Sequence, residues 1–235
     1  MSGVMHHPTR DILTEELFAP VAVRAYTSLV EPGLIPLLRS AEVPATERMV
    51  ASRQAEFATA RACARAAMAD LGIDDAVPKR EGGSPQWPAG LAGSISHTRG
   101  FCLAVASGAG HLIGVDVEEI ARMSQGVERR ILVDDERDQL HGLSHDERQR
   151  RVATIFAAKE AFYKAHYELD ARYLGFDVIA VRVDGDELFF EASSGDVDAA
   201  VVEGTTGRAR VYQGRVIAGI SINPVGLAAA LRSQA

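Results

Sequence analysis

The segment from Gly114 to Glu118 reads GVDVE and directly follows the apolar residues Leu112 and Ile113. An apolar run of this length predicts a β-strand that ends in acidic residues. Asp116 and Glu118 stand two positions apart, so on a strand both carboxylates point to the same face. The segment therefore predicts a strand that delivers two acidic groups to one place on a sheet.

A second segment, from Phe156 to Lys164, reads FAAKEAFYK and sets Glu160 between two lysines. On a helix, Lys159 falls near the centre of the apolar stripe, where an ammonium group needs an anionic partner. Glu160 lies at the edge of that stripe and supplies a third carboxylate. Three converging carboxylates with cations beside them are typical of a Mg²⁺-assisted reaction at a phosphate.

Two long helices are predicted outward from these segments. Thr46 offers an N-cap for an alanine-rich helix that reaches Leu71. Ser144 and Glu147 form a capping box that opens the second helix, which runs to about Leu169.

Two arginines lie on the apolar side of the first helix. Arg53 and Arg61 both project within about 40° of Phe57 on a helical wheel. Two interpretations stay open: the side chains extend to water along the edge of the core, or they bind an anion at a cleft.

Apolar runs in the first half and alternating apolar residues from Val178 onwards predict strands at residues 21–26, 101–106, 112–118, 180–183, 188–190, 209–212 and 216–222. The runs 101–106 and 112–118 are joined by a glycine-containing turn, which predicts an antiparallel pair. The order of helix and strands in the first half recurs in the second. We therefore expect an α+β fold with a pseudo-two-fold repeat. Its subdomains, residues 1–118 and 119–235, would each hold a long helix packed on a small antiparallel sheet.

Composition excludes several classes of protein. The 235-residue chain has a formal net charge of −7, which argues against a nucleic-acid binder with a broad basic surface. No apolar run approaches the ~18 residues of a membrane span. Met1 to Arg10 lacks the features of a secretory signal, so we expect a cytoplasmic protein. Cys63 and Cys102 lack metal-ligand spacing and are predicted to be buried free thiols.

A glycine- and proline-rich loop from Lys79 to Gly93 holds the only tryptophan, Trp87. Such spacing predicts an ordered loop with fixed turns. Ser96 and His97 follow this loop. Either their polar groups form hydrogen bonds within the protein, or they donate to phosphate oxygens.

The segments Trp87–His97, Gly114–Glu118 and Phe156–Lys164 together resemble the signature of the 4′-phosphopantetheinyl transferases. The resemblance covers roughly residues 46–164 and looks closest to the monomeric surfactin-synthetase type, in its siderophore-synthase branch. It implies a pseudo-two-fold α+β protein whose halves enclose coenzyme A and which works as a monomer with Mg²⁺. Such enzymes transfer phosphopantetheine to a serine of an acyl or peptidyl carrier protein and release adenosine 3′,5′-bisphosphate.

The resemblance also implies roles for single residues. The Mg²⁺ ligands would be Asp116, Glu118 and Glu160, and the coenzyme A contacts would be Arg53, Arg61, Lys79, Ser96, His97, Lys159 and Lys164. Glu160 is the first candidate for the base that activates the carrier serine, with Glu118 as the second. Lys159 would stabilise the leaving group.

Carrier proteins are typically acidic, so a chain at −7 must dock them through a local patch. The candidates are Arg122, Arg129, Arg130 and Arg137, for which the alternative is a solvated loop. Two other functions stay open. One is a Mg²⁺-dependent phosphohydrolase or nuclease, and the other is a non-catalytic module that binds coenzyme A.

Overall fold

The computed structural model describes residues 7–224, which divide into two compact units. The units meet between Ala109 and Gly110, nine residues before the boundary that we predict after Glu118. The strand that carries Asp116 and Glu118 therefore belongs to the second unit, because it pairs with the last strand of the described chain. The first six residues of the Met1–Arg10 segment lie outside the described residues.

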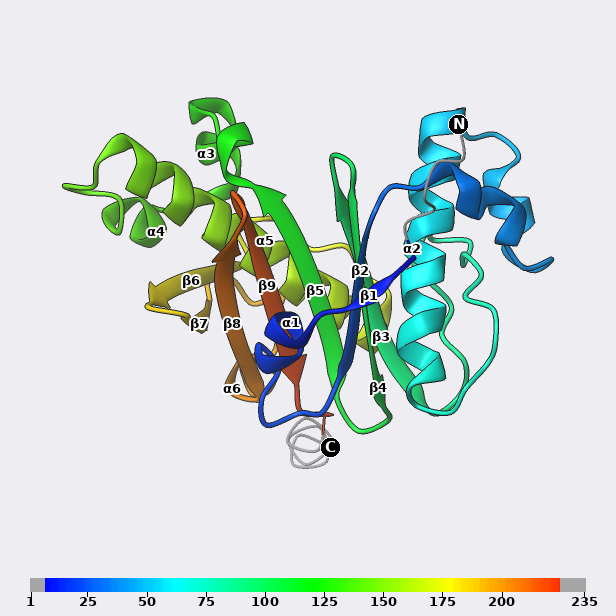
Figure 1. Ribbon diagram of the computed structural model, residues 1–235. Helices are drawn as coiled ribbons and strands as arrows, with labels where there is room; N and C mark the ends of the chain where they lie inside the picture. Colours follow the sequence, from blue (N-terminus) through cyan, green and yellow to red (C-terminus); the bar gives the residue numbers. More distant parts are fainter. Residues whose placement is uncertain (1–6, 225–235) are drawn as a thin grey trace. The chain divides into compact units, whose positions relative to one another are not determined.

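The first unit holds a four-stranded antiparallel sheet in the order β1-β2-β4-β3 (Figure 1). Its elements are β1 (Thr9–Arg10), α1 (Ile12–Glu16), β2 (Arg24–Leu29), two 3-10 turns (Pro32–Leu37 and Val43–Thr46), α2 (Ala51–Ala69), β3 (Leu91–Thr98) and β4 (Phe101–Gly108). Alanines favour the helix and are small enough to let α2 lie close against the sheet. The helix begins later than predicted, because Thr46 belongs to a 3-10 turn and bonds Val43.

The core of the first unit lies between α2 and β4. It contains Cys63, Met68, Cys102 and Ala104, with the ring of Trp87 packed among them. Both cysteines are buried free thiols, as predicted.

The second unit holds a five-stranded antiparallel sheet in the order β5-β9-β8-β7-β6. Its elements are β5 (Leu112–Glu119), a 3-10 turn (Ile120–Arg122), α3 (Gln125–Ile131), α4 (Asp134–Asp138), α5 (His145–Asp170), β6 (Ile179–Asp184), β7 (Glu187–Ala192), α6 (Ala199–Glu203), β8 (Thr205–Tyr212) and β9 (Arg215–Ile222). The capping box of Ser144 and Glu147 is present at the start of α5. Buried aliphatic and aromatic side chains of α5, including Ile155 and Phe162, form the core with the sheet.

The predicted antiparallel pair of residues 101–106 and 112–118 is wrong. β4 pairs with β2 and β3, whereas β5 pairs with β9, so the two runs lie in different sheets. Both runs are buried almost throughout, and a turn between two apolar runs does not decide whether they pair with each other or with other strands.

The predicted internal repeat is present. In the first unit β4 lies between β2 and β3, and in the second β9 lies between β5 and β8. The β3–β4 hairpin turns through Arg99 and Gly100, and the β8–β9 hairpin turns through Gln213 and Gly214. Each hairpin thus has a two-residue loop that ends in a glycine with positive φ. One long helix packs on each sheet, which confirms the expected α+β architecture.

No helix within residues 7–224 is long and apolar enough to cross a membrane.

Candidate functional site

Strand β5 turns three successive alternate residues toward α5. Gly114 approaches the helix so closely that a Cβ atom on it would collide with the carbonyl oxygen of Ala161. Asp116, two residues on, accepts a hydrogen bond from Lys164 of α5, with 2.7 Å between Oδ1 and Nζ. Glu118 follows after another two residues, and alternation along a strand places it on this same face. The structure thus joins the two acidic segments that the sequence singled out.

The carboxylates of Asp116, Glu118 and Glu160 form one electrostatic cluster. Burial raises the pKa of Glu118 to about 7, and the negative charges of Asp116 and Glu160 add to the effect. The pKa of Glu160 is also raised, first by burial and then by Asp116. These groups repel one another in a partly buried place, and a bound cation would relieve that repulsion.

The donor set fits a hard divalent cation, since Mg²⁺ prefers carboxylate oxygens. Asp116 is nearly fully buried and pairs with Lys164, whose ammonium also bonds the Val115 carbonyl oxygen at 3.2 Å. Within residues 7–224, no three or more His, Cys, Asp or Glu side chains are already arranged as a metal cage. The site is therefore a cluster of candidate ligands, with Lys164 neutralising one of them.

Lys159 lies in the core of the second unit, as its position in the apolar stripe predicts. Its side chain is completely buried, and its ammonium pairs with Glu136 at 2.8 Å. It also donates to the carbonyl oxygens of Ile131 at 2.9 Å and Phe176 at 2.6 Å. Adjacent helix positions point about 100° apart, so Lys159 faces the core while Glu160 projects in a different direction.

A basic cluster in the first unit joins α2 to β3. Arg53 contacts the ring of His97 and forms an ion pair with Glu56 at 2.9 Å. His97 Nδ1 lies 4.0 Å from the same Glu56 carboxylate. The structure thus brings two of the predicted coenzyme A contacts together and adds an acidic neighbour that the sequence did not single out.

Arg61 is buried two turns further along α2. Its Nε donates to the Val77 carbonyl oxygen at 2.5 Å, and its guanidinium stacks over Phe57 at 4.1 Å from the ring centre. Burial lowers its pKa to about 10. The bond to Val77 ties Arg61 to the start of the loop in which Lys79 is exposed.

Ser96 and His97 point to opposite faces of β3, because neighbouring strand residues alternate. Ser96 is buried, whereas His97 is exposed beside Arg53. The two predicted phosphate contacts are therefore not on one face. Gly93, at the end of the predicted loop, lies in β3 and has a packing role, since a Cβ on it would collide with the indole of Trp87.

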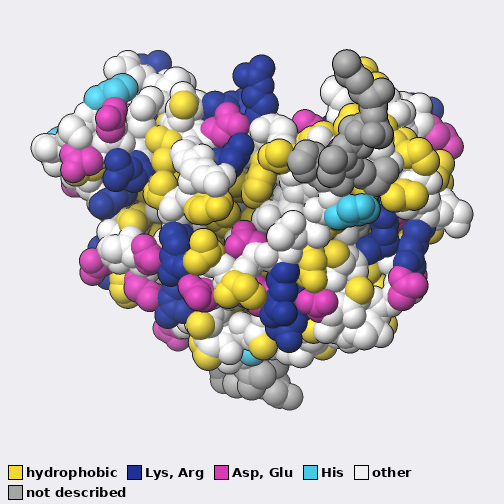
Figure 2. Space-filling view, viewed as in Figure 1, with side chains coloured by type: hydrophobic (Ala, Val, Ile, Leu, Met, Phe, Trp, Pro, Cys, Tyr) yellow, Lys and Arg dark blue, Asp and Glu magenta, His cyan; other side chains and the backbone are white. Residues whose placement is uncertain are grey.

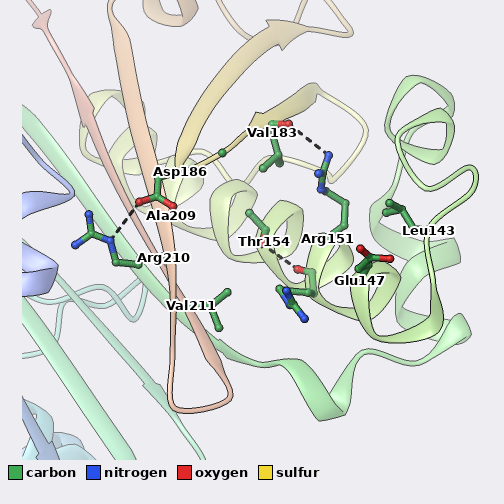
Figure 3. A pocket seen from close by; sticks show the side chains of 11 residues that line it. Leu143, Glu147, Arg151, Thr154, Val183, Asp186, Ala209, Arg210 and Val211 are labelled. Atoms are coloured by element: carbon green, nitrogen blue, oxygen red, sulfur yellow. Dashed lines mark hydrogen bonds and ion pairs between the residues drawn. The ribbon is translucent and has the colours of Figure 1, made fainter.

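A pocket of about 380 Å³ opens in the second unit between α5 and strands β6 and β8 (Figure 3). Arg151 bonds the Val183 carbonyl oxygen across it, and Arg210 pairs with Asp186 at its side. None of the predicted site residues is among the residues that line it.

The arginines proposed for docking lie on and around α3 and α4, elements that the weak sequence pattern did not predict. Arg122, Arg129 and Arg130 are exposed. Arg137 is half-buried, pairs with Asp134 and donates to the Arg129 carbonyl oxygen.

Comparison with known proteins places this geometry in a family. A model of the 4′-phosphopantetheinyl transferase N-terminal domain matches residues 41–107, and one of the 4′-phosphopantetheinyl transferase superfamily matches residues 112–203. The two matches fall on either side of the boundary between the units.

Several named relatives are similar to this chain in sequence. The 4′-phosphopantetheinyl transferase Svp of Streptomyces mobaraensis is 35% identical over 80% of this chain and 80% of its own length. The 4′-phosphopantetheinyl transferase PptT of Mycobacterium tuberculosis is 37% identical over 69% of this chain and 72% of its own. Enterobactin synthase component D of Salmonella typhi is 37% identical over 48% of each chain.

Among solved structures, a Bacillus anthracis holo-(acyl-carrier-protein) synthase in complex with CoA (3′,5′-ADP) has a TM-score of 0.37 and 25% identity. The match covers 47% of this chain and 94% of the synthase chain. The sequence matches alone carry the assignment, and they confirm the resemblance seen in the motifs. This chain belongs to the 4′-phosphopantetheinyl transferase family.

Proposed function

We propose that this protein transfers 4′-phosphopantetheine from coenzyme A to a serine of an acyl or peptidyl carrier protein and releases adenosine 3′,5′-bisphosphate. The observation that carries the proposal is the cluster of Asp116, Glu118 and Glu160 between β5 and α5, with raised pKa values at both glutamates. The family membership supports the reaction, and the carboxylate cluster supports its dependence on Mg²⁺.

Asp116, Glu118 and Glu160 would hold Mg²⁺. The ion would neutralise pyrophosphate oxygens and the charge that develops on the leaving phosphate. Lys164 already neutralises Asp116 at 2.7 Å, and its half-buried ammonium would also contact a phosphate bound at the cluster.

The carrier serine must lose a proton as its oxygen attacks the β-phosphorus of coenzyme A. Glu160 is our first candidate for the base, and Glu118 is the second. Burial and repulsion raise the pKa of both, which brings a carboxylate nearer to the pH range in which it can accept a proton efficiently. Arg53 and His97 would bind phosphate oxygens of the adenosine end.

The experiment is an intact-mass measurement of an apo carrier protein incubated with this protein, coenzyme A and Mg²⁺. We expect the carrier to gain one phosphopantetheine unit and adenosine 3′,5′-bisphosphate to appear in equal amount. Hydrolysis of coenzyme A with no gain in carrier mass would indicate a phosphohydrolase. Binding of coenzyme A without any product would indicate a non-catalytic module, and either result would overturn the proposal.

A further inference from the structure

The buried position of Lys159 calls for a role other than binding phosphate. An ammonium group has three donors, and three acceptors surround this one: the Glu136 carboxylate and the carbonyl oxygens of Ile131 and Phe176. The side chain exposes no surface. Its polar capacity is filled within the second unit.

Glu136 is also completely buried, and its carboxylate forms hydrogen bonds with two further segments of the chain. Its carboxylate accepts hydrogen bonds from the backbone N–H of Val133 at 2.9 Å and of Val181 at 2.8 Å. The Lys159–Glu136 pair therefore joins α5 to the start of α4 and to β6, while Ile131 adds the end of α3.

The first unit contains the same arrangement at the equivalent place. Glu42 is fully buried and accepts from the N–H of Arg39 at 3.0 Å, from the N–H of Val77 at 3.0 Å and from the guanidinium of Arg65 at 2.5 Å. The number of residues between the glutamate and its cationic partner is also the same in both units.

In both units the cation lies on the long helix, 23 positions after its glutamate. In both, the glutamate also accepts from the N–H three residues before it. The first unit has this pair but none of the three candidate metal ligands. The pair is thus part of the repeated architecture and does not depend on the chemistry of the carboxylate site.

In the second unit, however, the pair stands next to that site. Glu160 lies between Lys159, which the Glu136 pair fixes, and Ala161, whose carbonyl oxygen lies against Gly114 of β5. Two neighbours held on different sides leave α5 little freedom to rotate about its axis at Glu160.

We propose that Lys159 and Glu136 form a buried brace that orients Glu160 toward Asp116 and Glu118, so that Lys159 is a positioning residue and not a phosphate ligand. The inference rests on the proposed Mg²⁺ site for its kinetic consequences. It rests on the contacts of Lys159 and Glu136 alone for its structural ones.

The test compares Lys159→Met, Glu136→Gln, the double variant and the control Arg65→Met. Thermal unfolding is measured first without metal. Each of the two single variants should lower the melting temperature strongly, because each leaves one partner buried without its counter-charge. The double variant should lose clearly less than the sum of the two.

The same variants are then assayed for transfer and for the Mg²⁺-induced rise in melting temperature. Lys159→Met and Glu136→Gln should both need several-fold more Mg²⁺ for half-maximal effect, with the KM for coenzyme A within about twofold of wild type. Arg65→Met should lose stability but keep the wild-type Mg²⁺ dependence, because its brace holds no metal ligand. Where a Met variant does not fold, Lys159→Arg should restore folding and Mg²⁺ dependence, since the first unit uses an arginine here.

A KM for coenzyme A raised tenfold or more in Lys159→Met, with wild-type kinetics in Glu136→Gln, would overturn the brace in favour of a phosphate contact. Strictly additive losses of melting temperature would also overturn it. If wild-type protein transfers nothing, the proposed function fails, and the unfolding cycle and the Mg²⁺-induced shifts still decide the brace.

Discussion

Glu118 links the chemistry of the site to the stability of the protein. Its pKa is about 7 in the folded state against an ordinary value of 4.5. Between those two pH values the folded state keeps a proton that the unfolded state has released. The free energy of unfolding that Glu118 contributes therefore falls as the pH rises across this range.

Replacing Glu118 by Gln should remove that loss. In metal-free buffer we expect the variant and the wild type to be similar near pH 4.5. At pH 8 the variant should be more stable by about 1–2 kcal/mol, after discounting for partial exposure. Melting temperatures measured across pH in EDTA check this. A difference that stays constant, or that shrinks as the pH rises, would contradict the raised pKa.

Arg53 offers a second prediction for a single side chain. Arg53→Ala should raise the KM for coenzyme A about 10-fold with little change in kcat, because a charge-assisted bond to the bound substrate is lost. The matched control is Glu56→Gln, which removes the carboxylate that now pairs with Arg53 at 2.9 Å and should leave the KM equal or lower. Initial rates at varied coenzyme A decide it, and an unchanged KM in Arg53→Ala would remove this residue from the site.

The contact between β5 and α5 sets the spacing of the site at the scale of elements. Gly114→Ala would push its Cβ into the Ala161 carbonyl oxygen, so we expect a loss of about 1–3 kcal/mol in stability. Gly195→Ala is the control, because nothing lies within 4 Å of a Cβ there. Urea unfolding of both variants measures the effect. Equal stabilities of the two variants would show that the helix and the strand can separate freely.

Elements with strong local signals were predictable from the sequence. The capping box of Ser144 and Glu147 and the alternating strands of residues 180–222 are found where expected. The helices α3 and α4 were missed because they are short and mostly polar. Strand partners were also missed, since β5 finds β9 about 100 residues later and no local pattern encodes that choice.

The candidate site was predictable only in part, for a similar reason. The i, i+2 spacing of Asp116 and Glu118 places both on one face, and that relation is local. The burial of Lys159 was visible in its stripe position, but its partner Glu136 lies in an acidic run that has no distinguishing pattern. The equal 23-residue spacing of Glu42–Arg65 and Glu136–Lys159 is a signal that could have identified it.

At the scale of the whole molecule, the distribution of charged side chains decides how an acidic carrier protein can dock. On the face drawn in Figure 2, basic, acidic and apolar side chains are interspersed, without a broad basic surface. With a net charge of −7, attraction of an acidic carrier must come from a local group of arginines. The exposed candidates are Arg122, Arg129 and Arg130.

Arg130→Glu should therefore raise the KM for the carrier several-fold and leave the KM for coenzyme A unchanged. The effect should weaken at about 0.5 M salt, since salt screens exposed charges. Arg182→Glu changes the net charge equally but lies on β6 over Phe189, so it serves as control. Carrier-dependent rates at two salt concentrations check the prediction. Equal effects of the two variants would indicate that net charge alone matters and would contradict a docking patch.

We propose that the carboxylates between β5 and α5 support Mg²⁺-dependent transfer of phosphopantetheine. The most direct measurement is the rate at which Glu160→Gln loads an apo carrier, followed by intact mass at saturating coenzyme A and Mg²⁺. Loss of a metal ligand and candidate base should lower the rate by about 10²–10⁴-fold, with the melting temperature near that of wild type. A Glu160→Gln protein that loads the carrier at close to the wild-type rate would contradict a role for this carboxylate in transfer.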